Sequence, residues 1–430
     1  MTFENKRLFL DRLALRRYRA LKQAGKMIRK DEAVAAIMTF PERFSNLPEY
    51  AFPRLRSLLD AHAPGGDIVH MTIGEPRHPI PDFVGDVFAQ TVDLFAKYPA
   101  NHGTPELLGA IADWIERRFE ARVDPDTQIM ALNGTREGLM NACIALSPEQ
   151  KNGKKPVVLI PNPFYQVYAV AAVTVGAEPV YVPATAQTGF LPDYAGLPAE
   201  ILDRTTIAYI CSPSNPQGAV APRDYLRDLI ALAEKHDFKI FADECYSEIY
   251  RGEAPAGAID VVQSLGADPE RVAIFHSLSK RSNLPGLRSG FVASGPKNIE
   301  HMKQLRAYAG APLSLPAQAV STRVWADEAH VISSRALYVE KLDMADEIFS
   351  GIDGAGAPDA GFFLWLPVED GEQAALKLWT ETGVRVVPGA YWSRDVQGQN
   401  PGKNYIRVAL VAPKTETQHG LIKLRDCLYG

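Results

Sequence analysis

Between about residue 100 and residue 300, short apolar runs alternate with longer amphipathic stretches. The runs are too continuously apolar for strands with one face in water, and RDYLRDLIALAEKHD (223–237) has the apolar spacing of a helix. Strands buried on both faces and separated by helices are typical of a parallel sheet covered on both sides. The pattern therefore predicts a doubly wound α/β domain. The expected strands are PVVLI (156–160), EPVYV (178–182), TIAYI (206–210), KIFA (239–242), RVAIF (271–275) and SGFVA (289–293).

From about residue 316 the pattern changes. A long helical stretch is followed by three apolar runs, FFLWLPV (362–368), GVRVVPG (383–389) and NYIRVAL (404–410), which glycine and proline turns separate. This order indicates a smaller α+β domain. We expect a large domain over residues 82–315, a small domain over 46–81 and 316–430, and an N-terminal extension over 1–45.

The extension is basic, with ten Lys and Arg residues against four Asp and Glu residues in 1–37. Its leucines have helical spacing, so an amphipathic helix, a transit peptide and a nucleic-acid arm all stay open. We favour an appendage that the fold does not need, with Met38 as a plausible natural start.

Composition narrows the class of protein. The net charge of −5 argues against a nucleic-acid binder, and no apolar run approaches the roughly 18–20 residues of a membrane span. The four cysteines lie far apart and form no metal-binding or disulfide pattern, so we expect no metal site and a reducing cytoplasm.

Polar residues follow several of the expected strands, at the edge where doubly wound sheets bind ligands. NGTREGL (133–139) leads into a helix, whose free N–H groups can hold an anion. Tyr165 follows 156–160 and offers a plate for a flat ring, and Asn215 follows 206–210. Taken singly, these residues are equally compatible with a helix cap, core packing and an Asx turn.

Asp243 ends the run KIFA and is therefore expected to be buried, where a carboxylate needs a cation or several donors. A magnesium-binding ATPase aspartate is one possibility, but it requires a G-x-x-x-x-G-K-[ST] loop that the chain lacks. A protonated pyridine nitrogen would satisfy the same carboxylate.

The stretch HSLSKRSNLPGLRSG (276–290) follows RVAIF. Lys280 is flanked by small serines that leave room beside it, and desolvation favours Schiff-base chemistry by a lysine. Ser277 and Arg288 supply a hydroxyl and a planar cation suited to a phosphate. An aromatic plate, an acid, a lysine and an anion cradle on successive strand ends together indicate pyridoxal 5′-phosphate.

With these motifs the chain resembles the class I/II aminotransferases of the fold-type I pyridoxal-phosphate enzymes, from about residue 46 to the end. The matching segments are MTIGEP (71–76), YPANHGTPELLGAI (98–111), NGTREGL, PNPFYQVY (161–168), SPSNPQG (212–218), FADECYSEIY (241–250), SLSKRSNLPGLRSGF (277–291), GFFLWL (361–366) and YIRVAL (405–410).

The resemblance implies a role for each matching residue. Lys280 would hold the cofactor and then move the proton, Asp243 would pair with the ring nitrogen, and Tyr165 would stack on the ring. Asn215 and Tyr246 would bind the ring oxygen. The residues implied for the phosphate are Gly134, Thr135, Arg136, Ser277 and Arg288.

Further implied roles concern substrate and assembly. Arg407, with Gly74 and Asn215 near it, would bind the α-carboxylate of an amino acid or 2-oxo acid. Tyr98 resembles a tyrosine that reaches the phosphate of the neighbouring subunit, which implies a homodimer.

Within the family, the segments are most similar to the N-succinyldiaminopimelate aminotransferases of lysine biosynthesis, which use 2-oxoglutarate. That donor carries three carboxylates, so Arg281, Arg306 and Arg77 are candidates for further substrate contacts, while the role of Asn283 is open. The alternatives are an aspartate, alanine or aromatic aminotransferase, a pyridoxal-phosphate-dependent β-lyase, and a ligand-sensing regulator on the same scaffold.

Overall fold

The computed structural model of the protein describes residues 44, 46, 47 and 49–430. The chain separates into two units, residues 1–47 and 48–430, and all strands of the described part belong to the second. The expectations for residues 1–37, Met38 among them, lie outside the described residues.

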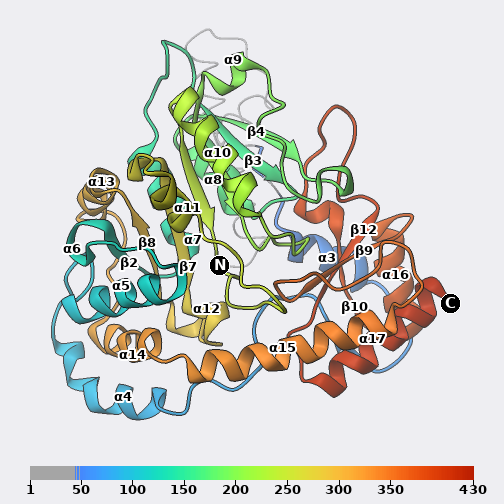
Figure 1. Cartoon of the computed structure of the whole chain (residues 1–430). Coiled ribbons are helices and arrows are strands. Elements are labelled where there is room, and N and C mark those ends of the chain that lie inside the picture. Colours follow the sequence, from blue (N-terminus) through green and yellow to red (C-terminus); the bar gives the residue numbers. More distant parts are fainter. Residues whose placement is uncertain (1–43, 45, 48) are drawn as a thin grey trace, which may run out of the picture. The chain divides into compact units, whose positions relative to one another are not determined.

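A seven-stranded sheet forms the centre of the second unit (Figure 1). Its strand order is β2-β8-β7-β6-β5-β3-β4, and β8 alone runs antiparallel to its neighbours in this sheet. The mostly parallel, doubly wound sheet that the sequence predicts is thereby confirmed. The strands are β2 (Ile129–Leu132), β3 (Val157–Asn162), β4 (Glu178–Pro183), β5 (Thr205–Cys211), β6 (Lys239–Asp243), β7 (Val272–Ser277) and β8 (Gly290–Ser294).

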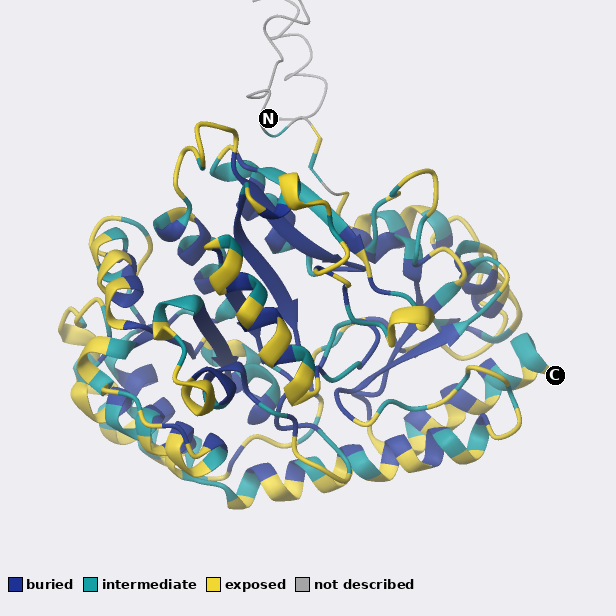
Figure 2. Cartoon of the chain, turned by 45° about the horizontal axis from the view of Figure 1, so that its top comes forward, coloured by how far each residue is buried: buried dark blue, intermediate teal, exposed yellow. Residues whose placement is uncertain are grey.

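Both faces of this sheet are buried, because successive strand residues enter different cores. Ile240 and Ala242 of β6 face one core, whereas Phe241 faces the other. Figure 2 shows that the central strands are buried, whereas the covering helices have buried residues on one side and exposed residues on the other. One face packs against α5 (Pro105–Phe119), α10 (Arg223–His236), α11 (Ala258–Leu265) and α14 (Leu315–Ala326), and the other against α7 (Thr135–Leu146), α8 (Gln166–Thr174) and α13 (Pro296–Arg306).

The expected domain boundary at residue 316 falls at the start of α14. This helix packs on the large sheet, because Val320 and Trp325 are fully buried in the same core as Trp114. The structure thus places α14 with the large sheet, and the rest of the domain division stays a prediction.

A second group of strands forms an antiparallel three-stranded sheet, β11-β12-β9, and a parallel pair, β1-β10. The strands are β1 (Val69–His70), β9 (Phe363–Pro367), β10 (Val384–Arg385), β11 (Val387–Pro388) and β12 (Tyr405–Ala409). The helices around them are α3 (Ala51–Leu59), α15 (Ala329–Ile348), α16 (Gly371–Thr382) and α17 (Lys414–Tyr429).

Helix α15 connects the two groups of strands in the chain: it follows α14 directly and packs along α17 (Figure 1). The remaining helical segments are short: α4 (Val84–Thr91), η2 (Val92–Ala96), α6 (Pro125–Gln128), η3 (Ala186–Thr188), α9 (Ala199–Leu202), α12 (Leu278–Arg281), η4 (Pro269–Arg271), η5 (Pro285–Leu287) and η6 (Gly389–Trp392). In the part of the chain that the structure describes, no helix combines the length and apolarity needed to cross a membrane.

Candidate active site

A cavity of about 320 Å³ opens beyond the carboxyl ends of the central strands. Strands β6 and β7 end at it, and β12 of the smaller sheet contributes Arg407 from the other side. Parallel strands bring their ends to one edge of a sheet, so residues far apart in the chain meet there. The predicted residues that line the cavity are Gly74, Thr135, Arg136, Tyr165, Asn215, Asp243, Tyr246, Ser277, Lys280, Arg288 and Arg407.

Lys280 projects into this cavity from α12, one turn after β7 ends. Its Nζ donates to the carbonyl oxygen of Gly74 and lies 5.5 Å from the ring centre of Phe362. The pKa of Lys280 is lowered to about 8, chiefly by burial and to a smaller extent by the nearby cation of Arg407. A lysine in this environment readily gives the neutral amine that attacks an aldehyde or accepts a proton.

Asp243 is 5% exposed at the end of β6. One carboxylate oxygen accepts a hydrogen bond of 2.7 Å from Tyr168 Oη, and the other lies 3.4 Å from the backbone nitrogen of Cys245. Burial raises the pKa of Asp243, while its hydrogen bonds oppose that shift. No Lys or Arg of the described residues pairs with this carboxylate, so it can receive a cation from a ligand.

The start of α7 and Arg288 form a cradle for an anion. Gly134, the residue before the helix, has φ of +83°, and a Cβ there would collide with the guanidinium of Arg288. Arg288 donates to the carbonyl oxygens of Pro285 (2.9 Å) and Asn133 (3.4 Å). The helix N-terminus and a guanidinium without a described carboxylate partner can hold a phosphate between them.

Ser277 caps α12 and belongs to the same edge. Its Oγ lies 3.1 Å from the backbone nitrogen of Ser279 and 2.9 Å from the Ser279 hydroxyl. Thr135 Oγ1 lies 3.1 Å from Cys245 Sγ. Small hydroxyl side chains thus surround the base of the cradle.

Arg407 is 2% exposed, and its guanidinium lies between two aromatic rings, 4.2 Å from the centre of Phe363 and 4.0 Å from that of Trp392. It donates to Asn215 Oδ1 (3.0 Å) and to the carbonyl oxygen of Thr72 (2.7 Å). Burial lowers the pKa of Arg407 to about 9. Within residues 49–430 no carboxylate pairs with it, so this cation is free to bind an anionic substrate group.

Aromatic side chains complete the walls. Tyr165 precedes α8, and its hydroxyl lies 2.8 Å from Arg136 Nε; this contact raises the pKa of Arg136. Tyr246 is 8% exposed and packs edge-on against Phe362 and Phe363. Flat surfaces and phenol groups therefore face the space beside Lys280.

The residues fit the group that the sequence indicates. An amine of lowered pKa, a buried acid without a cation and an anion cradle surround one cavity. Pyridoxal 5′-phosphate needs an amine for its aldehyde, an acid for its ring nitrogen and a cradle for its phosphate.

Comparison with known proteins decides the family. Residues 66–421 match the family of class I and II aminotransferases. The chain belongs to this family. Its members depend on pyridoxal 5′-phosphate.

Several known aminotransferases are similar to this chain over nearly its whole length. A solved aminotransferase from Neisseria meningitidis Z2491 is 36% identical with a TM-score of 0.85, and the match covers 90% of this chain and 99% of that one. LL-diaminopimelate aminotransferases of Dehalococcoides mccartyi and Desulforudis audaxviator are 31% and 32% identical. These matches cover 90% and 91% of this chain, and 99% of each relative.

Some predicted residues of the aminotransferase lie elsewhere. Arg281 does not reach the cavity: it is 3% exposed and pairs with Glu328 at 2.6 Å, so the expectation that it binds substrate is corrected. Arg306 pairs with Glu137 and Arg77 with Glu416, and neither lines the cavity. Tyr98 is fully exposed outside the cavity.

Other residues of the site escaped sequence reasoning. Tyr168, which donates to Asp243, is completely buried and stacks on Tyr209 with ring centres 4.4 Å apart. Its place three positions after Tyr165 is the signal that the sequence offers. Phe363 and Trp392 approach Arg407 from other parts of the chain, and no local motif connects them.

Proposed function

We propose that this aminotransferase transfers the amino group of a diaminopimelate-type donor to and from 2-oxoglutarate, and that Arg407 binds the α-carboxylate of each substrate. The observation that carries the proposal is the state of Arg407. A buried guanidinium with neutral partners beside Lys280 provides a place for a carboxylate next to a reactive amine.

The other residues of the site have separate roles in binding the cofactor and in moving protons. Arg288, Gly134, Thr135 and Ser277 would hold the phosphate of the cofactor, and Asp243, which Tyr168 orients, would keep the ring nitrogen protonated. When bound, pyridoxal 5′-phosphate supplies an electron-accepting ring for the electrons of the substrate's α-carbon. Lys280 would take the proton of the substrate's α-carbon as a base and afterwards return a proton as an acid, two roles for which its lowered pKa suits it. Asn215 and Tyr246 would bind the ring oxygen.

Two donors compete. N-succinyl-LL-2,6-diaminopimelate is supported by the resemblance of the segments around Lys280, Tyr165 and Asp243. LL-diaminopimelate is supported by the names of the relatives from Dehalococcoides mccartyi and Desulforudis audaxviator. The two donors differ in the end remote from Arg407: the first carries two carboxylates there, and the second carries one carboxylate and one ammonium group.

Arg136 is the arginine that we assign to that remote end. It lines the cavity, the hydroxyl of Tyr165 fixes its Nε, and no carboxylate of the described chain pairs with it. Since Arg288 lies against Gly134 at the phosphate cradle, the Arg136 side chain is not needed there, and only the backbone of this residue is kept for the phosphate role.

Half-reactions with purified holoenzyme test the proposal. Each donor is mixed with the enzyme without 2-oxo acid, and the absorbance change of the cofactor gives the rate; the panel contains both diaminopimelate donors, glutamate, aspartate, alanine and phenylalanine. We expect one diaminopimelate donor to exceed the last three in kcat/KM by at least about tenfold. Equal rates with aspartate, alanine or phenylalanine would refute the donor class, and release of ammonia with a keto acid would identify a β-lyase.

Arg136→Gln sharpens the choice of donor. We expect kcat/KM to fall by about tenfold to a hundredfold for the diaminopimelate donor and to stay within about twofold for alanine, which has no remote charge. An equal fall for both donors would place Arg136 at the phosphate instead.

We also propose a cytoplasmic homodimer. Phe88, Val92, Phe95 and Tyr98, in and just after α4 and η2, expose apolar surface, and the four cysteines are free. Light scattering coupled to size exclusion should give twice the chain mass for the wild type and a shift toward the monomer for Phe95→Asp. A wild type that is monomeric at micromolar concentration contradicts the assembly.

A further inference from the structure

Three polar residues follow Lys280 directly, and all three are buried. Arg281, Ser282 and Asn283 are 3%, 0% and 5% exposed. They lie outside the cavity, so they do not touch a substrate in it. Burial of three consecutive polar side chains is costly unless each has partners, and those partners reveal what the segment does.

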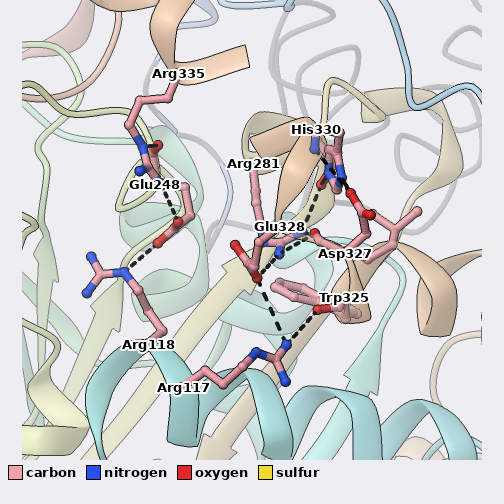
Figure 3. A network of polar contacts seen from close by, with 11 residues as sticks. Arg117, Arg118, Glu248, Arg281, Trp325, Asp327, Glu328, His330 and Arg335 are labelled. Atoms are coloured by element: carbon pink, nitrogen blue, oxygen red, sulfur yellow. Dashed lines mark hydrogen bonds and ion pairs between the residues drawn. The ribbon is translucent and has the colours of Figure 1, made fainter. Parts of the chain in front are cut away.

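Arg281 joins the end of α14 to the start of α15 (Figure 3). Its guanidinium donates to the carbonyl oxygens of Val324 (3.0 Å) and Asp327 (3.2 Å), and pairs with Glu328 (2.6 Å). A cation on the last carbonyls of a helix is a favourable C-terminal cap. The indole ring of Trp325, 4.9 Å from the guanidinium carbon, fixes its plane.

Ser282 is bound to the first turn of α15. Its Oγ lies 2.9 Å from His330 Nε2, and His330 Nδ1 lies 2.6 Å from Asp327 Oδ2. Arg281 Nη1 also donates to Ser282 Oγ at 3.2 Å. One assignment satisfies the serine and both ring nitrogens of the histidine: the serine donates to Nε2 of a neutral imidazole, whose Nδ1–H donates to Asp327. The connectivity is that of a hydrolase triad, but a serine without exposed surface cannot attack a substrate.

Asn283 connects the same segment to a third part of the chain. Its Nδ2 donates to Ser334 Oγ on α15 (3.0 Å) and to the carbonyl oxygen of Pro79 (3.1 Å). Its φ of +56° belongs to the left-handed region, which asparagine tolerates better than most residues. Pro79 lies five residues after Gly74, whose carbonyl accepts from Lys280.

We propose that Arg281, Ser282 and Asn283 form a clamp that fastens α12 to the start of α15 and so positions Lys280. The proposal rests on the catalytic role proposed for Lys280. Helix α12 has only four residues and cannot hold its own conformation. Besides the clamp, α12 is held by the buried side chain of Leu278, by the cap from Ser277 and by the contact of Lys280 with Gly74. The three clamp residues are therefore positioning residues, and they act through the lysine.

The test compares Arg281→Met with Arg204→Met. Arg204 is a matched control remote from Lys280: it pairs with Glu178 at 2.9 Å and donates to the carbonyl oxygen of Lys155 at 3.3 Å. Three quantities are measured on the holoenzyme: the midpoint of the pH titration of cofactor absorbance, kcat and KM separately, and the unfolding temperature.

We expect Arg281→Met to shift the absorbance midpoint by about half a pH unit or more and to lower kcat by about tenfold, with KM changed less. Arg204→Met should lose thermal stability while both the midpoint and kcat stay at the wild-type values. Arg281→Lys should recover part of kcat, because a lysine still caps α14 but cannot form all three contacts.

If Arg281→Met does not fold, Asn283→Gly replaces it, since glycine keeps the positive φ and removes only the side-chain contacts. Wild-type titration and kcat in either folded variant would overturn the clamp. Failure of the catalytic role is recognised separately, by turnover that persists in Lys280→Ala.

Discussion

Two buried arginines have similar aromatic surroundings but different polar partners. Arg281 and Arg407 are 3% and 2% exposed. The guanidinium of Arg281 lies 4.9 and 5.6 Å from two tryptophan ring centres, and that of Arg407 lies 4.2 and 4.0 Å from the ring centres of Phe363 and Trp392. Arg281 pairs with Glu328, whereas Arg407 contacts only the neutral oxygens of Asn215 and Thr72.

We infer that the missing counter-ion, and not burial or residue type, distinguishes the arginine proposed for substrate binding. A buried ion pair such as Arg281 and Glu328 offsets its own desolvation. A buried cation with only neutral partners is left with part of that cost, which an incoming carboxylate relieves. Asp243 shows the same state with the opposite sign, because its donors are neutral too.

The largest effect is expected for Arg407→Met. Loss of a two-pronged, charge-assisted contact to the α-carboxylate should lower kcat/KM for every amino donor by about three orders of magnitude. The free energy of unfolding should change little or increase, since an unpaired buried cation is removed. Half-reaction kinetics and urea unfolding measure the two quantities. Wild-type kcat/KM in Arg407→Met would show that Arg407 does not bind substrate and so contradict the inferred difference from Arg281.

A smaller effect is expected for Asp243→Asn. The amide keeps the shape and a hydrogen bond to Tyr168 but cannot hold a proton on the ring nitrogen. We expect the cofactor to stay bound and kcat to fall by about two orders of magnitude. Stopped-flow absorbance of the half-reaction checks it, and Glu178→Gln, at a carboxylate whose side chain is 43% exposed and which pairs with Arg204, serves as the control.

The third effect concerns pH. Burial lowers the pKa of Lys280 from 10.5 to about 8. Between these values the unfolded chain binds a proton that the folded, cofactor-free protein does not, so folded stability rises with pH in this interval. Relative to Lys280→Met, the cofactor-free wild type should gain stability from pH 8 to pH 10, as urea unfolding at the two pH values can show. A difference independent of pH contradicts the lowered pKa.

The smallest effect is expected for Arg77→Ala. Its partner Glu416 is 2.6 Å away, but both side chains are more than a third exposed, so solvent screens the pair. The free energy of unfolding should change by no more than about 0.5 kcal/mol, with kcat/KM unaltered. A fall in kcat/KM specific to the diaminopimelate donor would return Arg77 to the substrate site.

Much of the fold could be predicted from the sequence, because apolar runs directly report strands buried on both faces. The runs 239–242 and 271–275 fall within one or two residues of β6 and β7. The same logic anticipated that Asn215, Asp243 and Lys280 would meet, since ends of parallel strands share an edge.

The predictions that failed concerned residues whose interaction partners lie far away in the sequence. Arg281 was expected at the substrate because it follows Lys280, but Glu328 lies 47 positions later, and no local pattern announces that pair. Trp392 likewise approaches Arg407 only because η6 folds beside β12. Sequence spacing shows which residues share an element, whereas counter-ions are found only once the chain has folded.

The extended segment through Thr72 and Gly74 has a consequence for regiochemistry. The carbonyl oxygen of Thr72 accepts from Arg407, and that of Gly74 accepts from Lys280. Two residues of extended chain span at most about 7 Å, so one short backbone segment contacts both the proposed carboxylate-binding arginine and the proposed catalytic lysine. We therefore expect donors whose amine is on the carbon next to the carboxylate to react faster than ω-amino acids, whose amine lies farther from the carboxylate.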